Sequence, residues 1–244
     1  MKHSLTSNLI RLLFQAALVV CAVVPAPTQK AGGSGSELQQ KLAAVKQSVA
    51  ENQQKLRQYQ WTETTQLTLK GDAKPPRQSL CQYGPDGQVQ KTPIGAPAPE
   101  PSGGRIKQRI VKKKKEEMQD YTGQVKTLLA KYVPPDPQKM EQAFKAGNAA
   151  LNPNPGAQTA ALVFKNYAQP GDQMTLSFST ATKKISTLNV NTYMDDPKDV
   201  VTLAVQISSL PDGTNYAQQT VLDAAAKKLQ VTTTNSNYQR LGER

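Results

Sequence analysis

The last third of the chain, residues 159–235, alternates apolar and polar residues in short runs that turn residues separate. In the clearest run, Val201, Leu203 and Val205 take every second position. Successive side chains of a β-strand point to opposite faces of a sheet, so this spacing predicts a strand with one buried face. The gaps between runs are too short for helical crossovers, and the pattern therefore predicts antiparallel hairpins.

Further alternating runs and clear turn residues extend this pattern. Additional strands are predicted at residues 174–178, 188–192, 216–222 and 229–233. Pro170 and Gly171 suit the central positions of a type II turn, and Pro211-Asp212-Gly213 suits a tight turn that ends in a left-handed glycine. Residues 195–199 carry a proline and form another connector. The last third is thus predicted to be an antiparallel meander.

The first half of the chain adds three predicted strands. Residues 59–69 form the longest run. One face carries Tyr59, Trp61, Glu63, Thr65, Leu67 and Leu69, and threonines dominate the other. Residues 78–83 and 88–94 flank Gly84-Pro85-Asp86-Gly87 and read as a hairpin. Residues 152–156 are predicted to be a loop before the sheet resumes at residues 162–164.

Three segments show the spacing of amphipathic helices. Residues 36–59 carry an apolar stripe made of Leu38, Leu42, Val45, Val49, Leu56 and Tyr59. This segment either packs across the sheet or pairs as a coiled coil, although Asn52 and Gln53 interrupt the stripe. Residues 118–132 form a second helix, and Asp136 caps a third that ends near Gly147. Met140, Ala143 and Phe144 give the third helix a narrow apolar face.

The stretch 105–132 concentrates positive charge in a chain with a formal net charge of +12. It includes the uninterrupted run Lys112, Lys113, Lys114 and Lys115. We interpret this run either as a contact with anionic lipid headgroups or as a solvated entrance to the helix that follows. Nucleic acid is not an expected partner, because no aromatic residues interleave with the lysines and the chain carries an export signal.

The N-terminus has the layout of a secretory signal. Lys2 and Arg11 precede an apolar run at residues 12–24, which is shorter than the roughly 20 residues of a membrane-spanning helix. We predict a signal peptide at residues 1–22, a small-residue tether at 23–35, and one domain at 36–244 with a proline-rich insertion at 95–104. Lipidation at Cys21 is the alternative, because residues 18–21 loosely resemble a bacterial lipobox.

The residue inventory left after cleavage disfavours catalysis. His3 is the only histidine and leaves with the signal, and Cys81 becomes the only cysteine, so no disulfide or histidine-containing site can form. Cys81 is either a packing residue or a reactive thiol. Glu63, Asp195 and Asp196 are available carboxylates, but the two aspartates lie in a predicted turn. We expect no enzyme activity, no catalytic residue, no metal and no cofactor.

The order of elements resembles a known family. A signal peptide, a long helix, a strand with Trp61, two middle helices and a terminal meander are similar to the LolA/LolB-like group of periplasmic lipoprotein carriers and receptors, and to exported bacterial proteins labelled outer-membrane lipoprotein sorting. Residues 174–178, 195–207 and 210–222 carry the likeness. The resemblance implies an α+β fold in the periplasm: a curved antiparallel sheet, or unclosed β-barrel, covered by amphipathic helices and holding acyl chains in an apolar concavity. The proline-rich insertion and the lysine cluster depart from it.

A curved sheet covered on one side by helices has a natural ligand site where the cover is incomplete. The candidate ligand-binding residues on the apolar sheet face are Trp61, Leu67, Leu69, Leu176, Phe178, Leu203 and Val205. The alternative is that these side chains are filled core. The leading hypothesis is thus an exported, monomeric binding protein for a lipid or lipidated protein. The alternative is a non-catalytic envelope interaction protein with a fully packed core.

Overall fold

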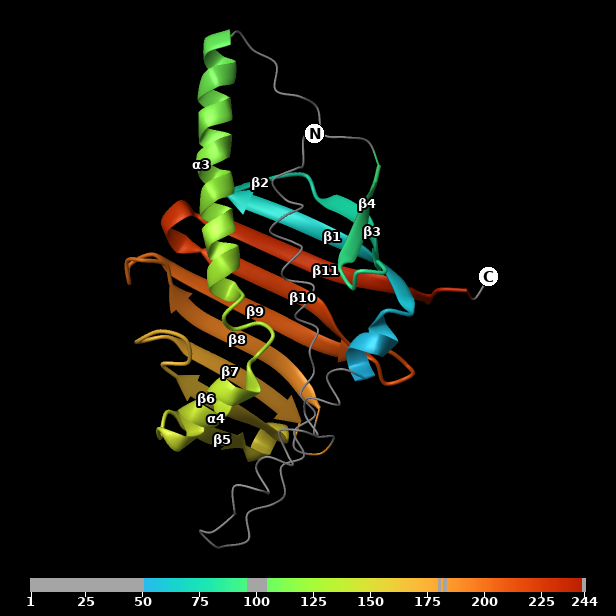
Figure 1. Ribbon diagram of the computed structural model, residues 1–244, viewed down its shortest axis with the longest axis vertical. Coiled ribbons are helices and arrows are strands. Elements are labelled where there is room, and N and C mark those ends of the chain that lie inside the picture. Colours follow the sequence, from blue (N-terminus) through green and yellow to red (C-terminus); the bar gives the residue numbers. More distant parts are fainter. Residues whose placement is uncertain (1–50, 96–104, 180, 182–183, 243–244) are drawn as a thin grey trace, which may run out of the picture.

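The computed structural model describes residues 51–95, 105–179, 181 and 184–242. They form one large, strongly curved antiparallel sheet of 11 strands that does not close, with helices on one of its faces (Figure 1). The predicted fold class, a curved antiparallel sheet covered by helices, is therefore confirmed. The predicted signal peptide and tether, and all but Gly95 of the predicted insertion, lie outside the described residues.

The strands follow the predicted runs closely. They are β1 (Tyr59–Leu69), β2 (Asp72–Ala73), β3 (Arg77–Tyr83), β4 (Val89–Ile94), β5 (Ala149–Asn154), β6 (Thr159–Lys165), β7 (Gln173–Ser179), β8 (Ile185–Tyr193), β9 (Val200–Ser209), β10 (Asn215–Ala224) and β11 (Leu229–Arg240). Their order across the sheet is β4-β3-β1-β11-β10-β9-β8-β7-β6-β5, with β2 paired to β1. The strands of the last third thus form the predicted meander, and Gly171 and Gly213 adopt positive φ in its turns.

The pairing of β1 with β11 joins the two halves of the chain into one sheet. These strands are antiparallel, with Glu63 opposite Asn235, Thr65 opposite Thr233 and Leu67 opposite Val231. No local pattern in the sequence indicates which strands become neighbours over such a separation. Because β1 lies beside β11, its inward side chains share the sheet face that the inward side chains of the last strands line.

The two edge strands are β4 and β5, and each contains a proline, Pro93 and Pro153. Proline has no amide hydrogen to donate, so it suits an edge strand and discourages pairing with another chain. The prediction of a loop at residues 152–156 is therefore wrong for its first part. Asn152, Pro153 and Asn154 belong to β5 and pair with β6.

The described helices differ from their predicted bounds. The lysine run lies within α3 (Arg105–Leu129), which begins 13 residues before the predicted start at Met118 and ends before Tyr132. The run is therefore not a helix entrance but part of the helix itself. Of the segment predicted as a helix over residues 36–59, residues 51–56 are helical, and Tyr59 already opens β1.

Helix α4 (Pro137–Lys145) begins as predicted. The carboxylate of Asp136 accepts a hydrogen bond from the backbone N–H of Gln138 at 2.8 Å, and Pro137 fills the first helical position. The predicted apolar face is only partly correct. Ala143 is buried, whereas the Phe144 side chain is 67% exposed and points away from the core.

Helix α3 packs across one end of the sheet. Its buried residues Tyr121, Val125 and Leu128 lie in one cluster with Leu203 of β9 and Leu229 of β11. The same cluster extends through the segment after α3 and across the strands from β6 to β11. We call this part of the inner sheet face the helix-covered half.

Polar contacts fix α3 to the turns at this end. The Tyr121 hydroxyl donates to Asp199 at 2.8 Å, in the turn between β8 and β9. Lys227, between β10 and β11, lies with its Nζ 5.4 Å from the centroid of the Tyr121 ring. Beyond the end of the helix, the Tyr132 hydroxyl donates to the buried carboxylate of Asp172. Asp172 also accepts hydrogen bonds from the backbone N–H groups of residues 167–169. Its buried carboxylate is thus well paired and anchors the loop between β6 and β7.

Candidate ligand-binding face

The seven candidate residues lie on the inner sheet face but do not form one site. Each occupies an inward position of its strand, as the alternation predicted. Among the described residues, they divide among three apolar clusters, and the described members of two of these all lie on strands. The structure therefore separates residues that the sequence placed in a single group.

Five of the seven candidates belong to the helix-covered half. Leu176, Leu203 and Val205 are buried in its cluster, and the partly buried Leu67 and Leu69 pack against it. Because residues of α3 are members of the same cluster, these five side chains have the packing of a protein core. A ligand that reached them would have to displace part of this packing.

The other two candidates, Trp61 and Phe178, lie in the strand-only clusters. Trp61 packs with Cys81 and Val89, and Phe178 packs with Ala160 and Ile185. Trp61 is near the start of β1, whereas Phe178 is near the end of β7 and Ile185 opens β8. In an antiparallel sheet these positions share one end, opposite the turns that α3 contacts. We call this region of the inner face the far half.

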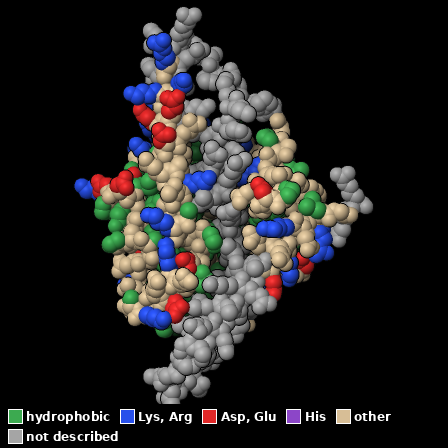
Figure 2. All heavy atoms as spheres, in the orientation of Figure 1, with side chains coloured by type: hydrophobic (Ala, Val, Ile, Leu, Met, Phe, Trp, Pro, Cys, Tyr) green, Lys and Arg blue, Asp and Glu red, His purple; other side chains and the backbone are tan. Residues whose placement is uncertain are grey.

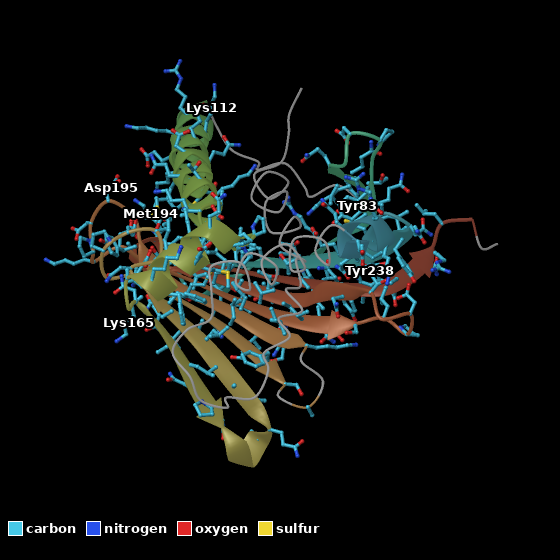
Figure 3. All side chains as sticks on the ribbon, turned by 60° about the horizontal axis from the view of Figure 1, so that its bottom comes forward. Tyr83, Lys112, Lys165, Met194, Asp195 and Tyr238 are labelled. Carbon is cyan, nitrogen blue, oxygen red and sulfur yellow. The ribbon has the colours of Figure 1, made fainter. Side chains whose placement is uncertain are left out.

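Aromatic rings dominate the β1 side of the far half. Trp61 stacks on Tyr238, with 5.5 Å between ring centroids and 12° between planes, and lies 5.6 Å from Tyr83. Tyr216 and Tyr59 approach Tyr238 at 4.4 and 6.3 Å. Burial raises the pKa of Tyr83 to about 12, so its phenol is neutral at physiological pH. Figure 3 shows Tyr83 and Tyr238 at one end of the sheet and Met194 and Asp195 at the other.

A buried ion pair adjoins the aromatic rings. Lys91 donates to both carboxylate oxygens of Glu63 at 2.7 Å, and the two side chains are only 8% and 2% exposed. The Thr65 hydroxyl donates to the same carboxylate at 3.3 Å. Burial raises the pKa of Glu63 above its ordinary value of 4.5, while the charge of Lys91 opposes that shift. The sequence indicated Glu63 as an available carboxylate but did not indicate Lys91.

Two further polar side chains beside this pair each carry an atom without a hydrogen-bond partner among the described residues. Thr233 is 1% exposed and Asn235 is 4% exposed. The Asn235 amide nitrogen donates to the Ala217 carbonyl at 2.8 Å, but within the described part of the chain nothing donates to its Oδ1. The Thr233 hydroxyl has no partner there either. Buried polar atoms are nearly always paired in proteins, so such a pair of atoms on one face is unusual.

The helical residues before β1 are tied to the far half through Asn52. Its side-chain amide donates to the Asn215 carbonyl at 3.0 Å and accepts from the Asn215 amide at 2.8 Å. Asn52, which interrupts the predicted apolar stripe, is therefore buried and binds the backbone of β10. Tyr59 adds a hydrogen bond to Asp212 at 2.9 Å.

The remaining chemical candidates show no catalytic arrangement within the described chain. Cys81 is fully buried, and burial raises the pKa of its thiol to about 12, which disfavours the reactive thiolate. Asp196 accepts from the backbone N–H of Lys198 at 2.9 Å, as turn residues do. Among the residues that the structure describes, no group of three or more His, Cys, Asp or Glu residues could hold a metal ion.

The lysine run lies on the part of α3 that projects beyond the sheet (Figure 1). Lys112, Lys113 and Lys114 are exposed, and Lys115 is helical. Figure 2 shows Lys and Arg side chains gathered along this projection, together with a few acidic ones. Lys112 approaches Glu116 at 3.8 Å in an exposed pair, which adds little to stability. None of the described helices is long and apolar enough to cross a membrane.

Comparisons with known proteins assign no family. No family model matches the sequence, and no curated protein matches it. Among solved structures, the chain is similar to a DUF1329 family protein from Desulfovibrio piger ATCC 29098, with a TM-score of 0.38 and 8% identity over 86% of this chain and 93% of that one. A similarity of this size is too low to assign a family, and the resemblance to LolA/LolB-like carriers stays a prediction.

Proposed function

We propose that this protein is an exported, non-catalytic binding protein that carries or receives a lipid or a lipidated protein, with the acyl chain on the far half of the inner sheet face. The observation that carries the proposal is the division of that face. The described helices α3 and α4 supply residues to the helix-covered cluster, whereas the described members of the clusters around Trp61 and Phe178 all lie on strands.

An acyl chain is the ligand that matches these clusters. The side chains around Phe178 are aliphatic or aromatic, and those around Trp61 are mainly aromatic. Burying a methylene group against such a surface contributes about 0.8 kcal/mol. A chain of ten or more methylenes therefore provides enough free energy for tight binding after the cost of ordering it.

Lipid retention and thermal stabilisation test the proposal. Native mass spectrometry of protein purified from an envelope fraction is expected to show a bound lipid. Added myristic acid is expected to raise the melting temperature, because a ligand that binds only the folded state stabilises it. Phe178→Arg is expected to reduce this gain by placing an unpaired charge in the apolar site.

Ser177→Arg is the matched control, because Ser177 is the neighbouring residue of β7 and points to the opposite face. It is expected to keep the full thermal gain. Absence of a retained lipid together with no thermal shift from myristic acid or lipopeptides would defeat the carrier proposal.

A packed envelope interaction protein is the second candidate, and the placement of Leu67, Leu69, Leu176, Leu203 and Val205 in or against the helix-covered core favours it. In that case protein contacts, rather than lipid, explain the exported fold. The lipid experiments separate the two functions, because a fully packed core gains no stability from an acyl chain.

We further propose that the projecting part of α3 contacts an anionic membrane surface. The first turn of the helix contains no acidic residue, and Arg105 and Lys107 lie near its start. Cations at a helix N-terminus oppose the helix dipole. The helix dipole therefore disfavours these two cations, whereas anionic headgroups would attract them.

Export itself is supported by the sequence of residues 1–22. N-terminal sequencing of the native protein is expected to begin near Val23. An intact Met1 in the native protein would contradict export, and a diacylated Cys21 would replace the cleaved form with a lipoprotein.

A further inference from the structure

Four polar side chains form a compact group on the inner face, and we call them the polar niche. They are Glu63 and Thr65 of β1 and Asn235 and Thr233 of β11. Glu63 lies opposite Asn235, and Thr65 lies opposite Thr233. All four are buried. A group of polar side chains at inward positions is therefore built into an otherwise apolar face.

The polar niche adjoins the cluster around Trp61 and is linked through β10 and β9 to the cluster around Phe178. Trp61 precedes Glu63 by two residues and shares its face of β1. On the other side, the amide of Asn235 bonds the carbonyl of Ala217, and Ala217 pairs with Ile207 of β9. Ala217 belongs to the helix-covered cluster, and Ile207 packs against both that cluster and the cluster around Phe178. An elongated ligand that lies on the cluster around Trp61 thus reaches the niche with one end.

The two polar atoms of the polar niche without partners in the described chain determine which chemical groups the end of a ligand must supply there. The Oδ1 atom of Asn235 is an acceptor, and the Thr233 hydroxyl can donate or accept. Neither has a partner among the described residues. A ligand group with O–H or N–H donors satisfies Asn235 and leaves Thr233 able to complete a second hydrogen bond.

The ion pair argues against a charged ligand group. Lys91 already donates to both oxygens of Glu63 at 2.7 Å, so the positive charge of Lys91 is balanced within the protein. An anionic head group would meet the Glu63 carboxylate and the Asn235 carbonyl oxygen, both of which repel it. Bringing a net charge into so buried a place is also costly.

We propose that the polar niche binds a neutral head group that carries hydroxyl or amide donors, such as the glycerol of an acylglycerol, while the acyl chain lies on the far half. This assignment rests on the proposed function, because it presumes that a chain binds at the far half. It names the ligand class as a neutral amphiphile with hydrogen-bond donors.

Two esters with the same acyl chain test the assignment. Methyl myristate has no hydrogen-bond donor, and 1-monomyristoylglycerol has two hydroxyl groups. With two added hydrogen bonds to buried partners, the glycerol ester is expected to bind the mature protein about tenfold more tightly. Titration of the Trp61 fluorescence measures both dissociation constants.

Thr233→Val removes the hydroxyl with little change in shape, and we expect it to reduce the preference to about threefold or less. Thr234→Val is the matched control, because Thr234 is the next residue of β11 and points to the outer face. It is expected to leave the preference unchanged. A preference that survives Thr233→Val intact would overturn the assignment of the niche.

The outcomes distinguish this inference from the proposed function. Equal binding of the two esters would overturn the head-group assignment and leave the acyl carrier standing. No binding of either ester, with no retained lipid in native mass spectrometry, would overturn the proposed function itself. Tighter binding of the myristate anion than of the glycerol ester would contradict the preference for a neutral head.

Discussion

The helix-covered half and the far half of the inner face arise from the same strands but have different interiors. In the helix-covered half, Val201, Leu203 and Leu222 form an apolar core with α3. In the far half, the inward positions of β1 and β11 hold Glu63, Thr65, Thr233 and Asn235 instead. A single alternating pattern thus supports a core at one end of the strands and a polar, aromatic region at the other.

The difference shows what strand alternation does and does not determine. Alternation decides which face a side chain occupies, because the period of two is a property of the strand. It does not decide what packs against that side chain. Leu203 is core because α3 reaches its end of the sheet, where Tyr121 and Tyr132 hydrogen-bond to Asp199 and Asp172 in the connections between strands.

The largest expected effect is in the far half, at the buried ion pair. Lys91→Met removes the partner of Glu63 and leaves a buried carboxylate unpaired. We expect this change to lower the free energy of unfolding by about 3–5 kcal/mol at pH 7. Urea denaturation followed by circular dichroism measures it.

The double variant Lys91→Met, Glu63→Leu is the control for this prediction. Replacing both charges by apolar groups avoids the unpaired carboxylate, so most of the lost stability is expected to return. If the double variant is as unstable as Lys91→Met alone, packing rather than charge pairing explains the effect.

In the helix-covered half the expected effect of a single hydroxyl is smaller. Tyr132→Phe removes the donor to Asp172 and the contact with the Thr192 hydroxyl at 2.7 Å. Because both partners are buried, we expect a loss of about 1–3 kcal/mol in the free energy of unfolding. Thermal or urea unfolding gives the value.

Tyr193→Phe is the matched control for Tyr132→Phe. The hydroxyl of Tyr193 donates to the Pro170 carbonyl at 2.6 Å in an exposed place, where water replaces it. We expect a loss below about 1 kcal/mol. Equal losses for the two variants would show that burial of the Tyr132 network does not matter.

The pH dependence of stability separates the halves further. Burial raises the pKa of Glu63 above 4.5, so the folded protein binds this proton more tightly than the unfolded chain does. The stability that this group contributes is complete below pH 4.5 and is lost as the pH rises through the raised pKa. Glu63→Gln removes this dependence, so the variant is expected to gain stability relative to the native chain as the pH rises.

Urea denaturation of both proteins at several pH values between about 4 and 8 checks this sign. A stability difference that is constant across that range would show that Glu63 keeps its ordinary pKa. Lys91→Met should enlarge the dependence, because the Lys91 charge opposes the rise in the pKa of Glu63.

Much of the far half could have been predicted from the sequence. The turn at Gly84-Pro85-Asp86-Gly87 leaves Tyr83 to pair with Val89, and the register then places Lys91 opposite Cys81. Combining this register with the inward position of Glu63 would have indicated a charge pair. The inward threonines of β1 and β11 were also visible, but their meeting depends on the long-range pairing of these strands.

Other features depend on contacts that no local pattern reveals. The run Asn152-Pro153-Asn154 has the composition of a turn, yet it forms β5 because an edge strand tolerates proline. Phe144 fits an apolar helix face, yet α4 turns that side chain outward. Asn52 binds the backbone of β10 far along the chain. For Asn52, a partner distant in sequence decides the role of the residue.

The smallest expected effect on stability concerns the projecting part of α3, which belongs to neither half. Lys112, Lys113 and Lys114 are exposed, so changing all four lysines of the run at residues 112–115 to Gln is expected to alter the free energy of unfolding by less than about 0.5 kcal/mol per site. Binding to vesicles that contain anionic lipid is expected to weaken by about 1 kcal/mol for each lysine near the surface. Vesicle cosedimentation at low and physiological salt measures the change.

Changing Lys139, Lys145, Lys165 and Lys184 to Gln removes the same charge elsewhere and should weaken binding less. Equal weakening by the two sets would mean that net charge, and not the projecting helix, attracts the membrane. No binding of the unmodified protein at low salt would contradict the membrane contact itself.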